Sequence, residues 1–430
     1  MRSKLIDELA DWEPFRNAAV ENAMRAVPRH LFLPGVPLEE AHSHGNVVTH
    51  RDSEGVATSS ASQPGIVGAM LEQLDVRSGH RVLEIGAGTG YNAALLARLA
   101  SPQGEVTTVD IDEDVAESAR RNLDAAGYGQ VRVICGDGEG GCSAAAPYDR
   151  IIVAGGAWDI PPAWLEQLAP GGRVVVPLRI RGLTRSVALE RHGACWRSLS
   201  VENCGFVPLR GSGCQPERNI RLNEDGKLIL RTDDGQSAAA EALRRGLGEV
   251  PAQLWTGVTV TDEEKGRGFG DLDYWLAAPY GLCRLLVRSS DHRLVTPALA
   301  YGSMALLQGD TFAYLTKRPG GEAGWYELGV CAYGLPVRSW PAGPPSGSVR
   351  GTPEADCPRE SRSTRLVRRS PPPAPELSWW PISVTSEWSS ARWPLMSGRE
   401  ASENAVLDGE HYALRDGRHL RRRDRRPVHP

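Results

Sequence analysis

The sequence predicts an α/β fold with a doubly wound parallel sheet, and three observations support this. From Arg81 onward, short apolar runs alternate with stretches of helical periodicity, the pattern of parallel strands joined by crossover helices. One such run, Val82–Ile85, enters a loop with glycines at every second position of residues 86–90, and a helix follows. The acidic Asp110 ends the next strand, where a carboxylate can bind ribose hydroxyls.

Five parallel strands are expected, followed by two strands that form an antiparallel hairpin through His192-Gly193 at one edge of the sheet. The parallel strands are expected over Arg81–Ile85, Glu105–Val109, Val131–Cys135, Arg150–Val153 and Arg173–Pro177. The hairpin strands are expected over Ser186–Leu189 and Trp196–Val201, and helices are expected to begin near Tyr91, Asp114 and Pro162.

The chain before this sheet, residues 1–78, is expected to form a helical lead-in. Leu5–Val27 carries alanine and charged residues at helix-friendly spacing, and a polar loop is expected to run on through Ser60. The stretch Ser60-Ala61-Ser62-Gln63-Pro64 then opens another helix with one apolar face. The Ser62 side chain fits the N-cap position of this helix, so a purely structural role is one interpretation of Ser62.

In a doubly wound sheet the ligand lies beyond the carboxyl ends of the strands. Four loops meet at that edge: the glycine loop, the turn at Asp110, Gly136-Asp137-Gly138 and Ala154-Gly155-Gly156. The glycine loop contains no lysine or arginine that could meet a pyrophosphate. Together with the two acids, this favours the methionine, ribose and adenine parts of S-adenosylmethionine over a dinucleotide.

Two further composition blocks follow the sheet. Residues 220–336 predict a small accessory α+β domain, with strands over Lys227–Arg231, Gln253–Val260, Cys283–Val287 and Trp325–Val330 and a helix over Ala238–Leu247. Residues 337–430 are rich in proline, arginine and serine and contain no lysine or phenylalanine, which predicts a disordered tail. The abrupt change also motivates the hypothesis that the tail is an out-of-frame reading of a GC-rich gene.

Composition argues against several classes of partner. The 430-residue chain has a formal net charge of −4, which gives no general attraction to nucleic acid or to an anionic membrane. Residues 1–15 carry charges throughout, unlike a secretory signal, and no apolar run approaches a membrane span. We therefore expect a cytoplasmic protein. The eight cysteines show no zinc-ligand spacing, and we expect no metal site.

Three polar motifs admit two interpretations. His42-Ser43-His44 could supply metal ligands, but no third ligand is nearby and a solvated loop is the simpler explanation. Lys265-Gly266-Arg267-Gly268 could contact phosphate, although a flexible charged turn accounts for it better. The arginine run at 421–426 could bind nucleic acid, but a solvated charge run is the commoner case.

Short motifs over Val20–Gly213 stand in an order and spacing typical of one family. They are Val27–Phe32 (VPRHLF), Ser62–Pro64 (SQP), Val82–Tyr91 (VLEIGAGTGY), Gly136–Gly138 (GDG), Ala146–Val153 (APYDRIIV), Ile160-Pro161, Gln167-Leu168, Pro170–Gly172 (PGG) and Phe206–Leu209 (FVPL). In this arrangement the chain resembles the protein-L-isoaspartate (D-aspartate) O-methyltransferases. The resemblance implies a Rossmann-like S-adenosylmethionine-dependent methyltransferase fold over residues 1–213.

The resemblance also implies which residues form the site. The implied cofactor-binding residues are Glu84, Gly86, Gly88, Gly90, Asp110, Asp137 and Gly138. The glycines of the loop would hold the methionine end, Asp110 the ribose, and Asp137 with Gly138 the adenine. Ser62 would lie at the reacting carboxylate, and backbone groups near Gly155 and Gly156 would orient that carboxylate.

The implied activity is carboxyl O-methylation of isoaspartyl or aspartyl side chains in proteins or peptides, with the methyl ester leading to a succinimide. A substrate carboxylate with a pKa near ~4 is ionised at neutral pH, so this chemistry needs no general base.

Three features depart from the repair enzymes of the family. The approach to the serine, Asn46–Ala61, differs from the usual pattern, Ala154–Trp158 replaces the usual Thr-Ala-Ala, and the chain carries a long C-terminal extension. These features resemble actinobacterial relatives that methylate an aspartate in a ribosomally made peptide precursor, which residues 220–336 could grip. The sequence leaves open repair and peptide tailoring, and the intact cofactor loops disfavour a non-catalytic binding module.

Overall fold

The computed structural model describes most of the first 334 residues. The described residues are 2–12, 14–53, 55–215, 217–232, 238–261, 273, 282–288, 294–299 and 302–334. The expected disordered tail over 337–430 and the motif at 265–268 lie outside them. None of the helices in these ranges is long and apolar enough to cross a membrane.

The first of two large sheets has seven strands in the order β5-β4-β3-β6-β7-β8-β9. They are β3 (Arg81–Ile85), β4 (Glu105–Asp110), β5 (Arg132–Cys135), β6 (Tyr148–Val153), β7 (Leu168–Ile180), β8 (Leu183–His192) and β9 (Cys195–Asn203). The neighbours from β5 to β7 are parallel, whereas β7, β8 and β9 pair antiparallel. The predicted doubly wound sheet with a terminal hairpin is confirmed. Because the strand order reverses at β3, the loops after β3, β4 and β6 open a crevice at the carboxyl edge.

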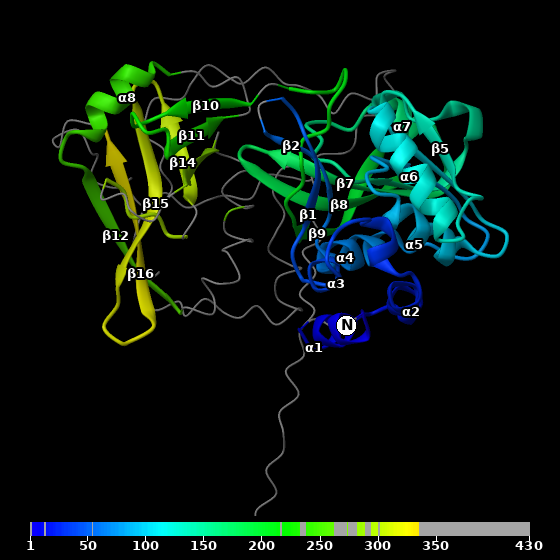
Figure 1. Cartoon of the computed structure of the whole chain (residues 1–430). Coiled ribbons are helices and arrows are strands. Elements are labelled where there is room, and N and C mark those ends of the chain that lie inside the picture. Colours follow the sequence, from blue (N-terminus) through cyan, green and yellow to red (C-terminus); the bar gives the residue numbers. More distant parts are fainter. Residues whose placement is uncertain are drawn as a thin grey trace, which may run out of the picture.

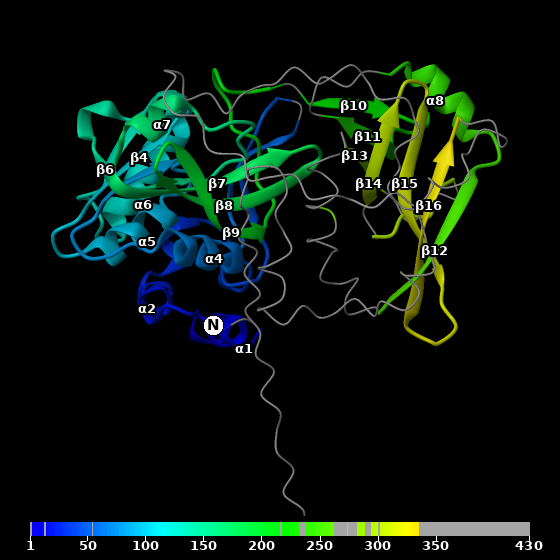
Figure 2. The same ribbon diagram turned by 180° about the vertical axis from the view of Figure 1, so that it is seen from behind.

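Helices cover both faces of this sheet (Figure 1, Figure 2). They are α4 (Pro64–Leu74), α5 (Tyr91–Ala100), α6 (Glu113–Ala125) and α7 (Pro162–Glu166), with the short 3-10 turns η2 (Gly138–Gly140) and η3 (Ser143–Ala145). Successive residues of a strand face opposite sides of a sheet. Val82 accordingly belongs to the apolar core that contains residues of α4 and α5, while Leu83 belongs to the core that contains Trp164 of α7.

The N-terminal segment contains helices where the helical lead-in was predicted, but it differs from the prediction in the stretch expected to be a polar loop. Its elements are α1 (Arg2–Trp12), α2 (Ala18–Ala26), the 3-10 turn η1 (Arg29–Phe32), α3 (Leu38–Ala41), β1 (Val47–Arg51) and β2 (Ala57–Ala61). The stretch predicted as a loop is thus partly an antiparallel hairpin of β1 and β2. Only Val47, Ser59 and Ala61 are buried within its two strands, so the sequence lacks the apolar alternation that marks a strand.

The second sheet forms the accessory domain and is antiparallel throughout, in the order β10-β11-β13-β14-β15-β16-β12. Its elements are β10 (Arg218–Arg221), β11 (Leu228–Thr232), α8 (Ala240–Leu247), β12 (Ala252–Thr261), β13 (Leu282–Val287), β14 (Gly302–Gln308), β15 (Thr311–Pro319) and β16 (Trp325–Tyr333). Leu243 and Leu247 of α8 pack on one face. The helix and the strands at β11, β12, β13 and β16 were predicted, whereas β10, β14 and β15 were not.

The two sheets lie side by side (Figure 1, Figure 2). The β7–β8 turn contacts β13, because a Cβ built on Gly182 would lie 3.1 Å from the backbone nitrogen of Arg284. Next to this turn, Leu183 packs with Leu282 and Met304 in a small apolar cluster. The accessory sheet therefore rests on the β7–β8 hairpin of the first sheet.

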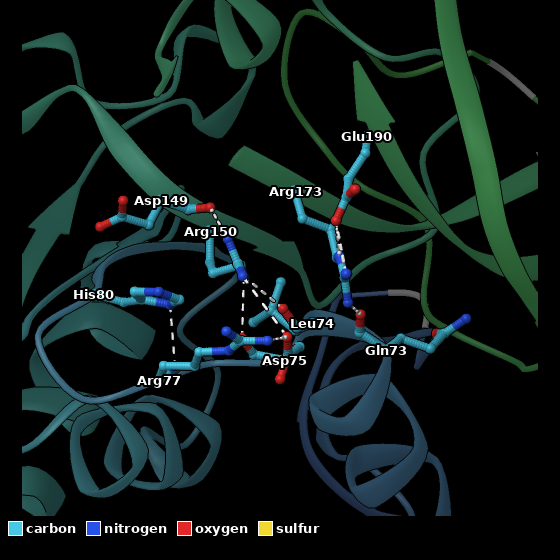
Figure 3. Close-up of polar contacts among 9 residues, drawn as sticks. All are labelled: Gln73, Leu74, Asp75, Arg77, His80, Asp149, Arg150, Arg173 and Glu190. Carbon is cyan, nitrogen blue, oxygen red and sulfur yellow. Dashed lines mark hydrogen bonds and ion pairs between the residues drawn. The ribbon is translucent and has the colours of Figure 1, made fainter. Parts of the chain in front are cut away.

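Two largely buried arginines fix the C-terminal end of α4 to the first sheet (Figure 3). Arg150 on β6 donates from Nε to the carbonyl oxygen of Leu74 at 2.7 Å. Arg173 on β7 donates from Nη1 to the carbonyl oxygen of Gln73 at 2.6 Å, and Glu190 on β8 accepts from its other nitrogens. The last carbonyls of a helix have no partner within the helix, and a cation there also complements the helix dipole.

The variant Arg150→Met tests this attachment. Without the guanidinium, the Leu74 carbonyl is left in a buried position without its donor, and we expect the free energy of unfolding to fall by roughly 2–3 kcal/mol. Urea denaturation followed by circular dichroism would measure the change.

Arg77→Met is the matched control, because Arg77 forms an ion pair with Asp75 at the same helix end but its side chain is 70% exposed. A change below about 0.5 kcal/mol is expected there. Equal losses in the two variants would contradict the proposed attachment.

Candidate functional site

A pocket opens at the carboxyl edge of the parallel strands, where the strand order reverses. It contains about 1360 Å³ of empty space, its open mouth included. Its lining includes the glycine loop, Thr58–Ser62 before α4, the turn at Asp110 after β4, Gly138 of η2, parts of the loop after β6 and Phe206–Arg210 after β9. Most residues predicted for the site line this pocket, namely Ser62, Glu84, Gly86, Gly88, Asp110, Gly138 and Gly155. The three that lie outside its lining are Gly90, Asp137 and Gly156.

The glycine loop turns sharply because its backbone takes left-handed values. The φ angle is +96° at Gly86 and +51° at Gly88, a region that residues with a Cβ rarely enter. The amide of Gly88 donates to Oδ2 of Asp110 at 3.0 Å, so the acid at the end of β4 fixes the loop. Gly90 allows close packing, since a Cβ built on it would lie 3.1 Å from the carbonyl oxygen of Ala119 on α6.

Asp110 lies at the pocket wall and already accepts two hydrogen bonds. Oδ2 accepts from the amide of Gly88, and Oδ1 accepts from the amide of Asp112 at 3.2 Å. Burial raises the pKa of Asp110, and the two amide donors oppose that rise. A carboxylate oxygen can accept a further hydrogen bond. The two oxygens can therefore bind a pair of neighbouring hydroxyl groups, as a ribose presents.

Glu84 lies beneath the glycine loop and is fully buried. One carboxyl oxygen accepts from Nδ2 of Asn92 at 2.7 Å, and the other accepts from the hydroxyl of Thr108 at 2.6 Å. Burial raises the pKa of Glu84 to about 7, and the two donors only partly oppose it because neither carries a charge. Besides lining the pocket, Glu84 ties the start of α5 to β4.

Ser62 lines the pocket between β2 and α4. The prediction that Ser62 caps α4 was wrong, because Gln63 takes the N-cap position and the helix begins at Pro64. A proline at the first helical position has no amide hydrogen that needs a cap. No hydrogen bond joins the Ser62 hydroxyl to another described residue.

A buried guanidinium holds the backbone of Ser62 in place. Arg29 is 2% exposed, and its Nη2 donates to the carbonyl oxygens of Ser62 at 3.0 Å and Ala61 at 3.3 Å. Its Nη1 donates to the carbonyl oxygen of Ala41 at 2.5 Å. Burial lowers the pKa of Arg29, and the carbonyl dipoles compensate the buried charge. The VPRHLF motif contains Arg29, but sequence reasoning missed this role.

Asp137 binds donors of the protein itself. Its carboxylate accepts from the amide of Glu139 at 3.0 Å, and from the amide and hydroxyl of Ser212 at 2.8 and 2.7 Å. These donors lower the pKa of Asp137 and tie the η2 turn to the segment after β9. Gly138 does line the pocket, with its carbonyl bound by Nε1 of Trp164 at 2.8 Å. The predicted adenine contact thus has better geometric support at Gly138 than at Asp137.

The two glycines of the loop after β6, Gly155 and Gly156, make different contacts. The amide of Gly156 donates to the carbonyl of Val207 at 2.8 Å, and its carbonyl accepts from the amide of Leu209 at 2.9 Å. These backbone groups are therefore already paired, which leaves Gly155 as the better candidate to orient a carboxylate. A Cβ built on Gly155 would lie 2.5 Å from a side-chain carbon of Leu209, so glycine allows the segment after β9 to pack closely.

Sequence reasoning also missed an ion pair at the pocket. Arg210 lines the pocket and binds the carboxylate of Asp112 through both terminal nitrogens, which raises the pKa of Arg210. The pair joins the turn after β4 to the segment after β9. The sequence did offer a signal, because Asp112 stands two positions after Asp110 and Arg210 directly follows the FVPL motif.

The histidines predicted to lie in a solvated loop make contacts with other side chains. Nε2 of His42 lies 3.2 Å from Nδ1 of His30, and Nε2 of His44 lies 3.0 Å from a carboxyl oxygen of Glu8. In the part of the chain that the structure describes, no group of three or more His, Cys, Asp or Glu side chains could hold a metal ion.

The pocket residues fit S-adenosylmethionine. The glycine loop admits close approach of a ligand, Asp110 offers acceptors for hydroxyls, and Ile111 and Trp164 supply apolar wall. The cationic Arg210 is neutralised by Asp112. The charged groups of the wall therefore suit a ligand that is itself positively charged at sulfur.

Comparisons with known proteins cover the part of the chain that forms this pocket, and the solved structure among them covers more of the chain than that part. A family model described as Protein-L-isoaspartate(D-aspartate) O-methyltransferase matches residues 1–213. A protein-L-isoaspartate O-methyltransferase of Methanopyrus kandleri is 40% identical over 212 residues, covering 49% of this chain and 91% of the relative. Protein-L-isoaspartate O-methyltransferase 1 of Archaeoglobus fulgidus is 46% identical over 192 residues, covering 45% and 85%. A solved protein-L-isoaspartate O-methyltransferase structure is similar at 24% identity and a TM-score of 0.45, covering 76% of this chain and 87% of that one.

The raised pKa of Glu84 predicts a pH dependence of stability. The folded-state pKa is about 7 against an ordinary value of 4.5, so between these values the folded protein holds a proton that the unfolded chain releases. The contribution of Glu84 is therefore most favourable below about pH 4.5 and is lost as the pH rises through 7. The loss amounts to roughly 3 kcal/mol.

We expect Glu84→Gln to remove most of this dependence, because the neutral amide has no charged form to bury. Thermal unfolding of both proteins between pH 5 and pH 8 would measure it. Parallel curves for the wild type and the variant would contradict the assignment.

Proposed function

The chain belongs to the protein-L-isoaspartate(D-aspartate) O-methyltransferase family, and on that premise we propose that it methylates the free carboxylate of isoaspartyl residues in proteins or peptides. It is an enzyme of the methyltransferase class. S-adenosylmethionine supplies the methyl group, which it carries on a positively charged sulfur. The observation that best supports the proposal is a single pocket lined by the glycine loop, Asp110 and Ser62. The glycine loop and Asp110, proposed to hold the cofactor, and Ser62, proposed to lie at the substrate carboxylate, therefore line the same space. We call these two parts of the pocket its cofactor side and its acceptor side.

The role of the chain in this reaction is alignment. A substrate carboxylate with a pKa near ~4 is already ionised at neutral pH and can attack a methyl group without a general base. Correct alignment of the reacting atoms can supply on the order of 7–11 kcal/mol. In the proposed site the Ser62 hydroxyl and the backbone at Gly155 orient the carboxylate. Arg29 keeps Ser62 in position through its bond to the Ser62 carbonyl.

The product of the transfer is a methyl ester that reacts further in the substrate itself. The amide nitrogen of the following residue attacks the ester carbonyl and forms a new C–N bond. Methanol leaves with the amide proton, and a succinimide ring results. Hydrolysis of the ring then gives either the aspartyl or the isoaspartyl linkage.

The tailoring alternative gains no support from the relatives compared above, which carry the isoaspartyl name. A non-catalytic binding module is also disfavoured, because the glycine loop, Asp110 and Ser62 still line one pocket.

The direct test is methyl transfer to matched peptides. A short isoaspartyl peptide and its aspartyl twin, each incubated with radiolabelled S-adenosylmethionine, should give strong labelling of the isoaspartyl form alone. Equal labelling of the two peptides, or none of either, would overturn the proposed acceptor.

Two variants separate the cofactor side from the acceptor side. Asp110→Ala should weaken S-adenosylmethionine binding about tenfold or more, because a hydrogen bond to a charged group contributes roughly 1.5–3 kcal/mol. Ser62→Ala should lower kcat about tenfold while leaving cofactor affinity within about twofold, because it removes one neutral donor on the acceptor side. Isothermal titration and steady-state kinetics would measure both. Unchanged turnover in Ser62→Ala would leave Ser62 with no role in the reaction.

A further inference from the structure

Trp158 forms part of the pocket wall, but no hydrogen bond holds its ring. Its indole Nε1 is buried and has no hydrogen-bond partner among the described residues. Trp164, which also lines the pocket, is anchored by contrast, because its Nε1 donates to the carbonyl of Gly138 at 2.8 Å. A buried indole N–H usually finds a partner. The position of Trp158 must therefore depend on another contact.

Arg179 on β7 supplies that contact. Its guanidinium carbon lies 4.9 Å from the ring centroid of Trp158, which is within the range of a cation–π interaction. Its backbone amide donates to the carbonyl of Ala157 at 2.7 Å, so Arg179 holds both the ring and the loop that carries it. A Cβ built on Gly156 would lie 3.2 Å from the side-chain carbons of Arg179, so glycine leaves room for this close packing.

Glu217 connects Arg179 to the accessory sheet. It stands just before β10, and its Oε1 forms an ion pair with Nη2 of Arg179. Its Oε2 lies 3.5 Å from Nε of Arg231 on β11. The side chains of Arg179 and Glu217 are 8% and 16% exposed, so water screens this pair less than a surface pair. A continuous series of contacts thus runs from the accessory sheet to the pocket wall.

We infer that Glu217 is a positioning residue. Through Glu217 the accessory sheet fixes the position of Trp158 in the part of the pocket wall that contacts the substrate peptide. Glu217 holds Arg179 against Trp158, and the indole ring forms the wall for the peptide segment that flanks the reacting carboxylate. The inference rests on the proposed function, because it names the residues that determine which substrate peptide the proposed active site prefers. Glu217 and Arg231 lie beyond residues 1–213, the part that matches the family.

The first test needs no acceptor. The fluorescence spectrum of Trp158 is obtained by subtracting the spectrum of Trp158→Phe from that of the wild type. The same subtraction is then made between two proteins that both carry Glu217→Gln. Neutralising Glu217 should loosen Arg179 from the ring and shift the difference spectrum. A spectrum that Glu217→Gln leaves unchanged would overturn the inference, whatever the acceptor proves to be.

The chain offers a matched control in a second Trp–Arg–Glu group. The guanidinium carbon of Arg318 lies 4.3 Å from the ring of Trp255, and Nε of Arg318 donates to Glu327 at 2.7 Å. This group lies on β12, β15 and β16, and none of its residues lines the pocket. Glu327→Gln removes the same kind of charge and should leave the Trp158 difference spectrum unchanged.

The second test measures acceptor binding. Glu217→Gln should raise KM for the isoaspartyl peptide about five- to tenfold, with kcat and the Kd of S-adenosylmethionine within about twofold of the wild type. Glu217→Asp should restore part of the affinity, and Glu327→Gln should have no effect. In a Trp158→Leu background, Glu217→Gln should add nothing, because the wall that it positions is gone.

The two proposals fail in distinguishable ways. If the wild type transfers no methyl group to the isoaspartyl peptide, the proposed function fails and the difference spectrum alone decides the role of Glu217. If the wild type is active and Glu217→Gln leaves KM unchanged, or acts additively with Trp158→Leu, the inference fails while the proposed function stands.

Discussion

Arginine side chains that donate to backbone carbonyls hold α4 at both ends, and the arrangement of the pocket depends on them. Arg29 binds the carbonyl of Ser62 just before the helix, and Arg150 and Arg173 bind the last carbonyls of the helix. A guanidinium presents five N–H donors in one plane, so one side chain can fix several carbonyls. Because α4 is a short helix held at both ends by these contacts, a shift of either end would move Ser62 relative to the glycine loop.

The sequence predicted the parallel strands well because helices bury them on both faces. Such strands appear as continuous apolar runs, and β3 begins and ends at the predicted residues, Arg81 and Ile85. The β1–β2 hairpin could not be found in the same way, since most of its side chains are polar and at least partly exposed. The strands β14 and β15 do contain apolar runs, at 304–307 and 312–315, and were overlooked.

Within the site, local motifs were informative and distant pairs were not. The glycine loop and Asp110 could be predicted because spacing along the chain identifies them. The Ser62 carbonyl bound by Arg29 and the Asp112 carboxylate bound by Arg210 lie 33 and 98 positions away in the sequence. No motif close to either arginine indicates these partners. Motif membership also did not indicate which residues line the pocket. Gly90, Asp137 and Gly156 belong to the same motifs as their neighbours but contact the protein itself.

The route of the chain out of the pocket has an evolutionary consequence. The segment that lines the pocket passes through Arg210 and Gly213 and enters the accessory sheet at Arg218, after a short linker. At this junction any fused module is a neighbour of the pocket. Under the proposed role of Glu217, changes in the appended module alter acceptor preference while the half that binds the cofactor stays as it was.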